Sequence, residues 1–392
     1  MSLFDKFQPI IDIRAELQQL GIMPFGAVTE KLLSATEGIV NGHQVILAGT
    51  NNYLGLTFDP ACIAAAKTAI DEQGTGTTGS RMANGTFAEH LQLEQELAQF
   101  FDRRHAIVFS TGYAATMGMA STLAGPGDVI VLDADSHASL YDGVRLSGAD
   151  IIRFRHNDAA DLEKRLRRLG ERIANTLIIV EGIYSMLGDQ APLGEIAAVK
   201  RRHGGMLLVD EAHSLGMLGD HGRGVAEAQG VEDAVDFIVG TFSKSLGAIG
   251  GYCVSNHPQL EAVRFATRSY IFTASPSPSV IASTRAALRL LQQRPELRER
   301  LWVNAQRLYD GLQALGFRMS PQVSPVVAVT IGERDQAIGW WQRLLELGVY
   351  VNLVMPPASP TDNSLLRCSI SAAHSRAQID RILDAFAALE SA

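Results

Sequence analysis

Polar residues follow two predicted buried strands near the middle of the chain. The segment LLVDEAHS places Asp210 at a strand end, with His213 three residues later. The segment FIVGTFSKSLG places Lys244 just after another strand, with Thr241 and Ser243 beside it. In an open α/β sheet, ligands bind outside the carboxyl ends of the strands. We therefore expect a carboxylate, an amine and hydroxyl groups at one ligand site.

These groups have the chemistry that a pyridoxal phosphate cofactor requires. A lysine such as Lys244 forms a Schiff base with the cofactor, and a carboxylate such as Asp210 keeps the pyridine nitrogen protonated. Hydroxyl groups and the amides at a helix start bind phosphate, and STGYAA offers such a start at Gly112 and Tyr113. Each residue alone is more often a cap or a surface residue, but their combination favours a cofactor site.

A glycine-rich segment offers a competing interpretation. Residues 74–80, GTGTTGS, match the dinucleotide pattern G-x-G-x-x-G through Gly74, Gly76 and Gly79. That pattern is informative only where a strand leads into it and a helix follows it. Here the segment follows a predicted helix over residues 60–72, and no βαβ unit with the required acidic residue follows. An NAD(P)-dependent oxidoreductase is therefore the disfavoured alternative.

The wider pattern predicts a large α/β part followed by a smaller α+β part. After residue 106, continuous β-branched runs alternate with helical patterns, which is typical of a largely parallel sheet covered on both faces. A helix over residues 7–20 and a hairpin around Asn41-Gly42 precede them. The expected division is an N-terminal segment (1–45), a large cofactor-binding domain (46–280) and a small C-terminal domain (281–392).

Composition disfavours several other classes of protein. The chain has 392 residues and a net charge of −8, which argues against a nucleic-acid partner. Its three scattered cysteines are too few for a disulfide framework or a zinc site, and no metal is expected. Neither a signal peptide nor a run of about 18 apolar residues is present. We expect a cytoplasmic protein, with contact at the inner membrane surface left open.

Longer segments carry a resemblance to a known family. LVDEAHSLGMLGDHGRG and GTFSKSLGAIGGY look like the α-oxoamine synthases, and NNYLGL, DADSHASLYDGVRLSGA, EGIYSMLGD and RCSISAAHS fit the same family. These fold-type I pyridoxal-phosphate enzymes resemble aspartate aminotransferase and condense an amino acid with an acyl thioester. GTTGSRMANGTFAEHLQLEQELA and YIFTAS look most like the bacterial serine palmitoyltransferase group. The resemblance implies a mostly parallel seven-stranded sheet and a small α+β C-terminal domain.

The resemblance also implies a role for each catalytic candidate. Lys244 would hold the cofactor and move protons at the substrate α-carbon. Asp210 would pair with the pyridine nitrogen, and His213 would bind the ring hydroxyl oxygen. His137 would stack on the ring face opposite Ala212, whose small side chain lets the ring lie flat.

Further contacts to the cofactor and the substrate are implied in the same way. Thr273 would reach the phosphate of the neighbouring subunit, so that a homodimer with shared sites is implied. The substrate-binding candidates are Asn52, Ser80 and Arg367, and the forked guanidinium of an arginine suits a carboxylate. The cofactor-binding candidates also include Gly112, Tyr113, Thr241 and Ser243 at the phosphate and Ser185 near the ring oxygen.

The implied reaction joins L-serine to palmitoyl-CoA and gives 3-ketodihydrosphingosine, CoA and CO2, the first step of sphingolipid synthesis. Three departures from the group leave the substrates open: Met355 replaces an arginine, Thr78 an asparagine and Asn51 a tyrosine. The alternative is a synthase that uses alanine or glycine with another acyl thioester, such as an 8-amino-7-oxononanoate or secondary-metabolite synthase. The acyl carrier is either CoA or a carrier protein. Intact Lys244 and Asp210 disfavour a non-catalytic partner subunit.

Overall fold

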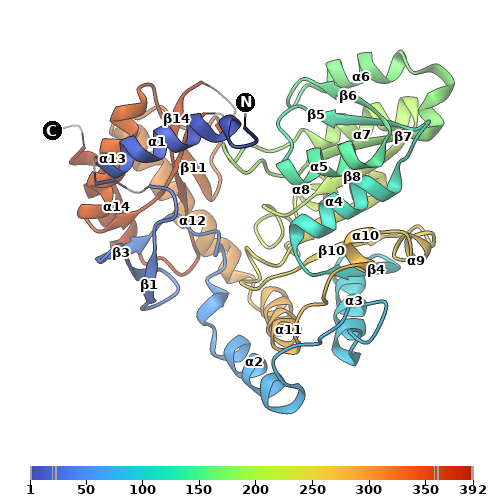
Figure 1. Ribbon diagram of the computed structural model, residues 1–392, viewed down its shortest axis with the longest axis horizontal. Helices are drawn as coiled ribbons and strands as arrows, with labels where there is room; N and C mark the ends of the chain where they lie inside the picture. Colours follow the sequence, from blue (N-terminus) through green and yellow to red (C-terminus); the bar gives the residue numbers. More distant parts are fainter. Residues whose placement is uncertain (1, 20, 23, 357, 360–361, 390–392) are drawn as a thin grey trace.

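The computed structural model describes residues 2–19, 21–22, 24–356, 358–359 and 362–389. The chain folds around three β-sheets. Figure 1 shows the largest sheet with its helices in one half of the molecule. The two smaller sheets and the first and last long helices form the other half.

The largest sheet has seven strands and is mostly parallel, as predicted. Only β10 runs antiparallel to its neighbours β4 and β9. The inner strands are buried along their length except at Met206, the first residue of β8, which explains their continuous apolar sequence. In sheet order the strands are β4 (His105–Phe109), β10 (Gly251–Ser255), β9 (Phe237–Thr241), β8 (Met206–Asp210), β7 (Thr176–Glu181), β5 (Val129–Asp133) and β6 (Asp150–Phe154).

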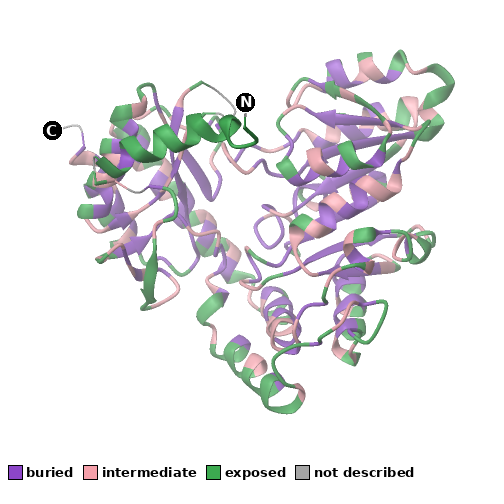
Figure 2. Ribbon diagram, in the orientation of Figure 1, coloured by how far each residue is buried: buried purple, intermediate pink, exposed green. Residues whose placement is uncertain are grey.

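Helices cover both faces of this sheet, because successive strand residues point to opposite sides. Ile178 belongs to the apolar cluster on one face, whereas Ile179 belongs to the cluster on the other face. Figure 2 shows the strands buried between their covering helices. On the face of Ile179 lie α4 (Gly112–Leu123) and α5 (Ala138–Ser147); on the face of Ile178 lie α3 (Ala88–Phe100), α6 (Ala159–Arg167), α7 (Leu193–His203) and α11 (Pro278–Gln293).

The N-terminal part begins with the predicted helix, observed as α1 (Gln8–Gln19), and continues into a second sheet. The hairpin of β2 (Glu37–Val40) and β3 (His43–Leu47) turns at Asn41 and Gly42, with φ of 48° and 78°. Two consecutive left-handed residues are what a tight hairpin turn requires. The sheet also contains β1 (Thr29–Leu32) and, in parallel with β3, β12 (Val349–Tyr350).

The C-terminal part is the expected small α+β unit. Its antiparallel sheet has the order β11 (Val326–Ile331), β14 (Ser364–Ser369) and β13 (Asn352–Val354). Ile46 of β3 shares an apolar core with Trp341 and Phe386 from this part of the chain. The helices are α12 (Glu296–Ala314), α13 (Arg334–Glu346) and α14 (Arg376–Ala387).

The predicted three-part division of the chain stays a prediction. Its boundaries at 45/46 and 280/281 fall inside β3 and α11. The shorter elements are η1 (Asp5–Phe7), η2 (Leu56–Phe58), η3 (Gly170–Asn175), α8 (Val225–Ala228), η4 (Glu232–Ala234), α9 (Leu260–Val263) and α10 (Arg268–Ile271).

The glycine-rich segment lies between two helices and has no strand before it. Helix α2 (Pro60–Gln73) begins with a proline, and the Asp59 carboxylate accepts a hydrogen bond from Ala61 N (2.9 Å). After α2 the chain forms a single bridge between Ser80 and Ala274 before α3. This is not the strand–turn–helix context of a dinucleotide site. None of the described helices is long and apolar enough to cross a bilayer.

Candidate active site

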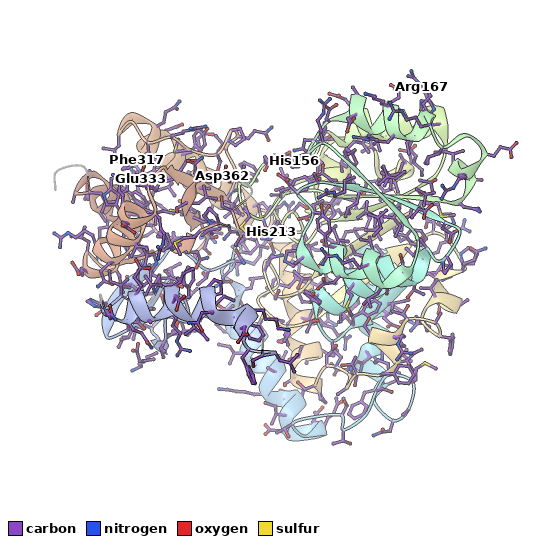
Figure 3. The ribbon with its side chains drawn as sticks, turned by 45° about the horizontal axis from the view of Figure 1, so that its top comes forward. His156, Arg167, His213, Phe317, Glu333 and Asp362 are labelled. Atoms are coloured by element: carbon purple, nitrogen blue, oxygen red, sulfur yellow. The ribbon has the colours of Figure 1, made fainter. Side chains whose placement is uncertain are left out.

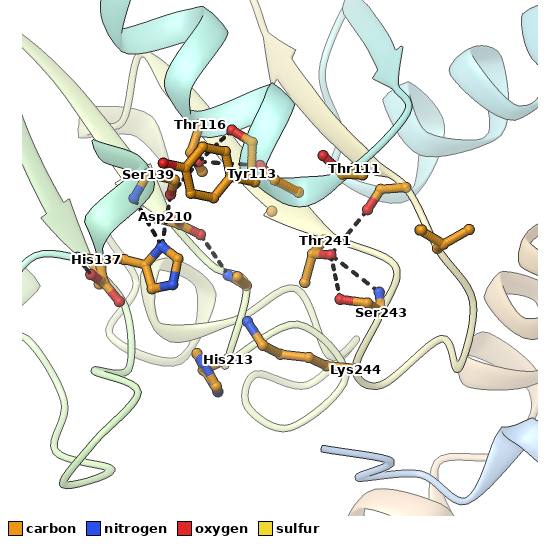
Figure 4. Close-up of a pocket in the computed structure, with 16 residues that line it drawn as sticks. Thr111, Tyr113, Thr116, His137, Ser139, Asp210, His213, Thr241, Ser243 and Lys244 are labelled. Atoms are coloured by element: carbon orange, nitrogen blue, oxygen red, sulfur yellow. Dashed lines mark hydrogen bonds between the residues drawn. The ribbon is translucent and has the colours of Figure 1, made fainter. Parts of the chain in front are cut away.

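A cavity of about 380 Å³ opens at the carboxyl ends of β8 and β9, beside the first turn of α4. Figure 4 shows the side chains that surround it. The cavity, called the cofactor pocket below, brings together these predicted residues: Gly112, Tyr113, His137, Asp210, Ala212, His213, Thr241, Ser243 and Lys244.

Lys244 presents its amine to the cofactor pocket (Figure 4). Burial among protein atoms lowers the pKa of this amine to about 8, against the raising effect of the Asp210 and Glu181 carboxylates. The neutral amine that a nucleophile requires is therefore reached near pH 8, far below the ordinary lysine range. Burial raises the pKa of Asp210, and the Lys244 cation is the largest opposing influence.

The ring of His137 is held in one tautomer by its neighbours. The backbone N–H of Ser139 donates to His137 Nδ1 (3.2 Å), and Ser139 Oγ lies 2.8 Å from the same atom. Because Nδ1 accepts from a backbone amide, the neutral ring carries its proton on Nε2. Burial lowers the pKa of His137, which favours that neutral ring. The His137 backbone N–H donates to Glu181, a buried residue whose pKa is raised well above its ordinary value by burial.

A chain of hydrogen bonds connects His213 to Arg367. His213 Nδ1 lies 2.8 Å from the Tyr53 hydroxyl, which donates to Asn51 Oδ1 (3.2 Å). Both terminal nitrogens of Arg367 donate to the same Asn51 oxygen (3.3 Å each). Burial, followed by the Lys244 and Arg367 cations, lowers the pKa of His213 well below its ordinary value. The ring is therefore neutral at neutral pH.

The first turn of α4 forms the predicted anion site. Thr111 Oγ1 caps the helix by accepting from Ala114 N (2.9 Å). The N–H groups that precede Ala114 in this first turn have no acceptors within the helix, so they are free to bind an anion. Thr241 Oγ1 lies 2.8 Å from Ser243 Oγ beside that turn. A Cβ at Gly112 would lie 2.6 Å from Thr241 Cβ, so only glycine lets the helix start approach β9 this closely.

Two predicted residues lie next to the cofactor pocket, without lining it. Ser185 lines a neighbouring cavity of about 490 Å³ that also reaches His137. The Ser185 carbonyl accepts from Arg367 Nε at 2.6 Å. Arg367 is buried, and none of the described carboxylates forms an ion pair with it.

The other three predicted residues lie outside the cofactor pocket. The Asn52 side chain is buried, and its amide donates to Thr57 Oγ1 (2.7 Å). Ser80 and Thr273 lie on two segments joined by the bridge between Ser80 and Ala274 and by Ser275 N donating to the Gly79 carbonyl (2.9 Å). Within one chain, these two segments do not reach the pocket lining.

Sequence reasoning missed several residues that complete the site. His156 bridges Asp133 (2.9 Å) and Asp189 (2.7 Å), and these carboxylates raise its pKa to about 10 against the opposing effect of burial. Figure 3 shows His156 and His213 where the two halves of the molecule face each other. Asp189 belongs to the segment that carries Ser185, so this ion pair positions that segment. Glu181, Tyr53 and Ser139 were also missed, although EGIYSM, NNYLGL and DADSHAS were singled out.

The donor set of the cofactor pocket fits pyridoxal phosphate. It offers one amine of lowered pKa, two buried carboxyl groups at strand ends (Asp210 and Glu181) and a helix start for a phosphate. Among the described residues, no group of three or more His, Cys, Asp or Glu could hold a metal ion.

Comparisons with known proteins agree with the geometry. The profile of aminotransferases of class I and II matches residues 43–386. The chain is 59% identical to a serine palmitoyltransferase of Caulobacter vibrioides (98% of this chain, 96% of that protein) and 53% identical to that of Sphingomonas paucimobilis (99% and 93%). It is 38% identical to an 8-amino-7-oxononanoate synthase of Geotalea daltonii (89% and 89%). A solved serine palmitoyltransferase with a PLP internal aldimine superposes with a TM-score of 0.97 at 52% identity, covering 100% of this chain and 99% of that one.

Proposed function

The chain belongs to the class I and II aminotransferase family, and we propose that it joins L-serine to palmitoyl-CoA as a serine palmitoyltransferase. The products are 3-ketodihydrosphingosine, CoA and CO2. The observation that carries this proposal is the cofactor pocket, in which Lys244 and Asp210 meet at the ends of adjacent strands. Relatives named serine palmitoyltransferase over almost the full chain favour these two substrates.

Pyridoxal phosphate is the cofactor, and the residues present would hold it at three points. Lys244 would bind its aldehyde, and Asp210 would keep a proton on its pyridine nitrogen. The first turn of α4, with Thr241 and Ser243, would bind its phosphate. When bound, the cofactor supplies an electron-accepting ring that stabilises negative charge at the substrate α-carbon.

Lys244 is the base that takes the α-proton of serine and later returns a proton to the same carbon. Its lowered pKa, about 8, suits proton transfer in both directions near neutral pH. His137 uses Nδ1 to accept from Ser139, which leaves Nε2–H as its donor toward the ligand. That donor would orient the amino acid so that the α-proton faces Lys244.

Arg367 would bind the serine carboxylate. It is a buried cation that donates hydrogen bonds to neutral oxygens of Ser185, Asn51 and Ser369. A buried guanidinium without a carboxylate is costly, and the substrate carboxylate would relieve that cost. Roles for Asn52 and Ser80 in binding the substrate stay predictions.

A homodimer would complete the site, with Thr273 reaching the phosphate in the partner subunit. The placement of Thr273 away from the pocket of its own chain favours this arrangement. Phe265 and Phe272 precede Thr273 in the chain and are 63% and 72% exposed. Large exposed aromatic side chains of this kind suit a subunit interface. A cytoplasmic location and contact with the inner membrane surface also stay predictions.

The test is a matrix of amino acids against acyl-CoAs of several lengths, scored by CoA release. Serine with palmitoyl-CoA should give the highest kcat/KM, and Lys244→Ala should abolish release with every pair. Because Met355 replaces an arginine of the group, alanine and glycine belong in the matrix. Turnover of alanine or glycine without turnover of serine would contradict the proposal and favour the related synthases.

A further inference from the structure

A second large cavity lies between helix α1 and the segment that follows β13. Its volume is about 780 Å³. Among the described side chains that line it, Arg14 is the only charged one, and the others are apolar. Ile10, Ile13 and Leu17 come from one side of α1, and Leu353 and Met355 face them across the cavity. We call this space the α1 cavity.

The α1 cavity and the cofactor pocket both adjoin the cavity beside Ser185, because that middle cavity shares lining residues with each of them. Met186 and Ala358 line both the α1 cavity and the 490 Å³ cavity beside Ser185. His137 lines both that middle cavity and the cofactor pocket. The three spaces therefore follow one another, from the amine of Lys244 to the apolar wall of α1.

We propose that the α1 cavity binds the acyl chain of the thioester substrate, with Ile13 and Met355 as residues that determine chain length. This inference rests on the proposed function. When the thioester carbonyl of a long acyl-CoA enters the site, its apolar chain gains by moving out of water. The α1 cavity is the apolar space that adjoins the cavity beside the cofactor pocket. Its volume lies within the range of ordinary ligand pockets, about 300–1,000 Å³.

Met355 would contact the acyl chain directly. Met355 is half-buried and packs against the C-terminal apolar core while it lines the α1 cavity. An unbranched thioether side chain adapts to the shape of an apolar ligand, whereas an arginine would bring a charge into the cavity. In this chain, position 355 therefore serves the acyl chain, and Arg367 is left to meet the amino-acid carboxylate.

Chain-length profiles of two matched variants test the assignment. Ile13→Trp replaces an aliphatic side chain that lines the cavity with a larger indole ring. Ile11→Trp adds the same indole ring to α1, but at an exposed position that does not line the cavity. We expect Ile13→Trp to lower the kcat/KM ratio of palmitoyl-CoA to octanoyl-CoA at least tenfold, because each methylene left in water costs roughly fourfold. Ile11→Trp should keep the wild-type ratio, and the KM for serine should stay unchanged in both.

Binding of hexadecyl-CoA thioether, measured by calorimetry, provides a readout without turnover. This probe has no carbonyl to react, and its Kd should rise about tenfold in Ile13→Trp and in Met355→Gln. Met355→Gln is included because it tests the same cavity without the packing defect that a tryptophan at position 13 could cause. If Ile13→Trp and Met355→Gln both keep the wild-type chain-length profile and the wild-type Kd, the cavity assignment is wrong.

The two proposals fail in different ways. A wild-type enzyme that condenses serine with palmitoyl-CoA, together with variants that keep its profile, would refute only the cavity assignment. A wild-type enzyme that does not condense serine would refute the proposed function, whereas thioether binding would still test the cavity.

Discussion

The hydroxyl of Tyr53 lies 2.8 Å from Nδ1 of His213. Both residues are buried, and the same hydroxyl donates to Asn51, whose oxygen accepts from Arg367. One tyrosine thus connects a residue of the cofactor pocket to the cation proposed for the substrate carboxylate. The cofactor side and the substrate side of the site share a single hydrogen-bonded frame.

Tyr53→Phe should weaken both sides of that frame. The loss of one buried hydrogen bond costs about 0.5–1.5 kcal/mol, so we expect a fall in kcat/KM for serine of up to about tenfold. The absorption band of the bound cofactor should shift as well, because His213 loses its fixed orientation. Steady-state kinetics and absorption spectra check this prediction, and an unchanged spectrum would place the tyrosine in a packing role only.

Lys244→Ala should remove catalysis without unfolding the protein. Loss of a general base alone typically costs about 10²–10⁴-fold, and this lysine is also the proposed attachment point of the cofactor. CoA release should fall by at least a thousandfold, and borohydride should no longer fix the cofactor to the chain. Far-UV circular dichroism and the Tm serve as controls. Residual turnover within tenfold of wild type would assign the base to another residue.

Reconstitution of the apoenzyme with pyridoxal phosphate should speed up with pH around a midpoint of about 8. The folded environment lowers the Lys244 pKa from 10.5, so the amine is mostly protonated below pH 8 and mostly neutral above it. Only the neutral amine attacks an aldehyde. Stopped-flow absorbance measures the rate at each pH.

Asp210→Asn provides the matched comparison for that pH profile. The Asp210 carboxylate raises the pKa of Lys244, so its removal should move the midpoint below 8. A midpoint near 10 in the wild-type apoenzyme would contradict the effect of burial on Lys244.

Met355→Arg should exchange one specificity for another. A hydrogen bond to a charged group is worth about 1.5–3 kcal/mol, so an added cation that reaches the serine carboxylate should lower the KM for serine about tenfold. The same cation should reduce the preference for long acyl chains, because it lies in the α1 cavity. Met355→Leu keeps the apolar wall and should leave both quantities within a factor of two. An unchanged KM for serine in Met355→Arg would place that side chain away from the amino acid.

Mixed dimers test whether Thr273 acts across the subunit interface. In a dimer of one Lys244→Ala chain and one Thr273→Val chain, a contact in trans leaves one site with both native residues. That site should keep the wild-type cofactor affinity and half of the wild-type activity per dimer. A contact within one chain would instead leave no native site, and the cofactor affinity of the active subunit would fall. Sedimentation confirms the dimer in each preparation.

Much of the fold is predictable because it depends on local patterns. Continuous apolar runs such as the one before Asp210 predict buried parallel strands, and the pair Asn41-Gly42 predicts its hairpin. The pocket residues at strand ends follow from the same patterns, since parallel strands bring their carboxyl ends to one edge.

The missed features depend on contacts between distant segments. The parallel pairing of β3 with β12 joins residues about 300 positions apart. The hydrogen bonds from His213 to Arg367 join three separate segments of the polypeptide. No local sequence pattern predicts that the Asn51 side chain contacts the arginine. Helix α13 is not among the elements predicted from the sequence, although Trp341 and Leu344 lie on one buried face of it. The ion pairs of His156 with Asp133 and Asp189 cannot be predicted without knowing which loops lie close together.

The pairing of β3 with β12 also bears on how the protein is made. During translation, β3 leaves the ribosome long before Val349 exists, so one edge of the early hairpin has no partner while nearly the whole chain is synthesised. An unpaired strand edge invites association with other nascent chains. The apolar side chains of Val45 and Ile46 also stay without most of their packing partners until the C-terminal part of the chain has been synthesised. Stop codons late in the gene should therefore expose the first hairpin, and the truncated products are expected to aggregate from their N-terminal end.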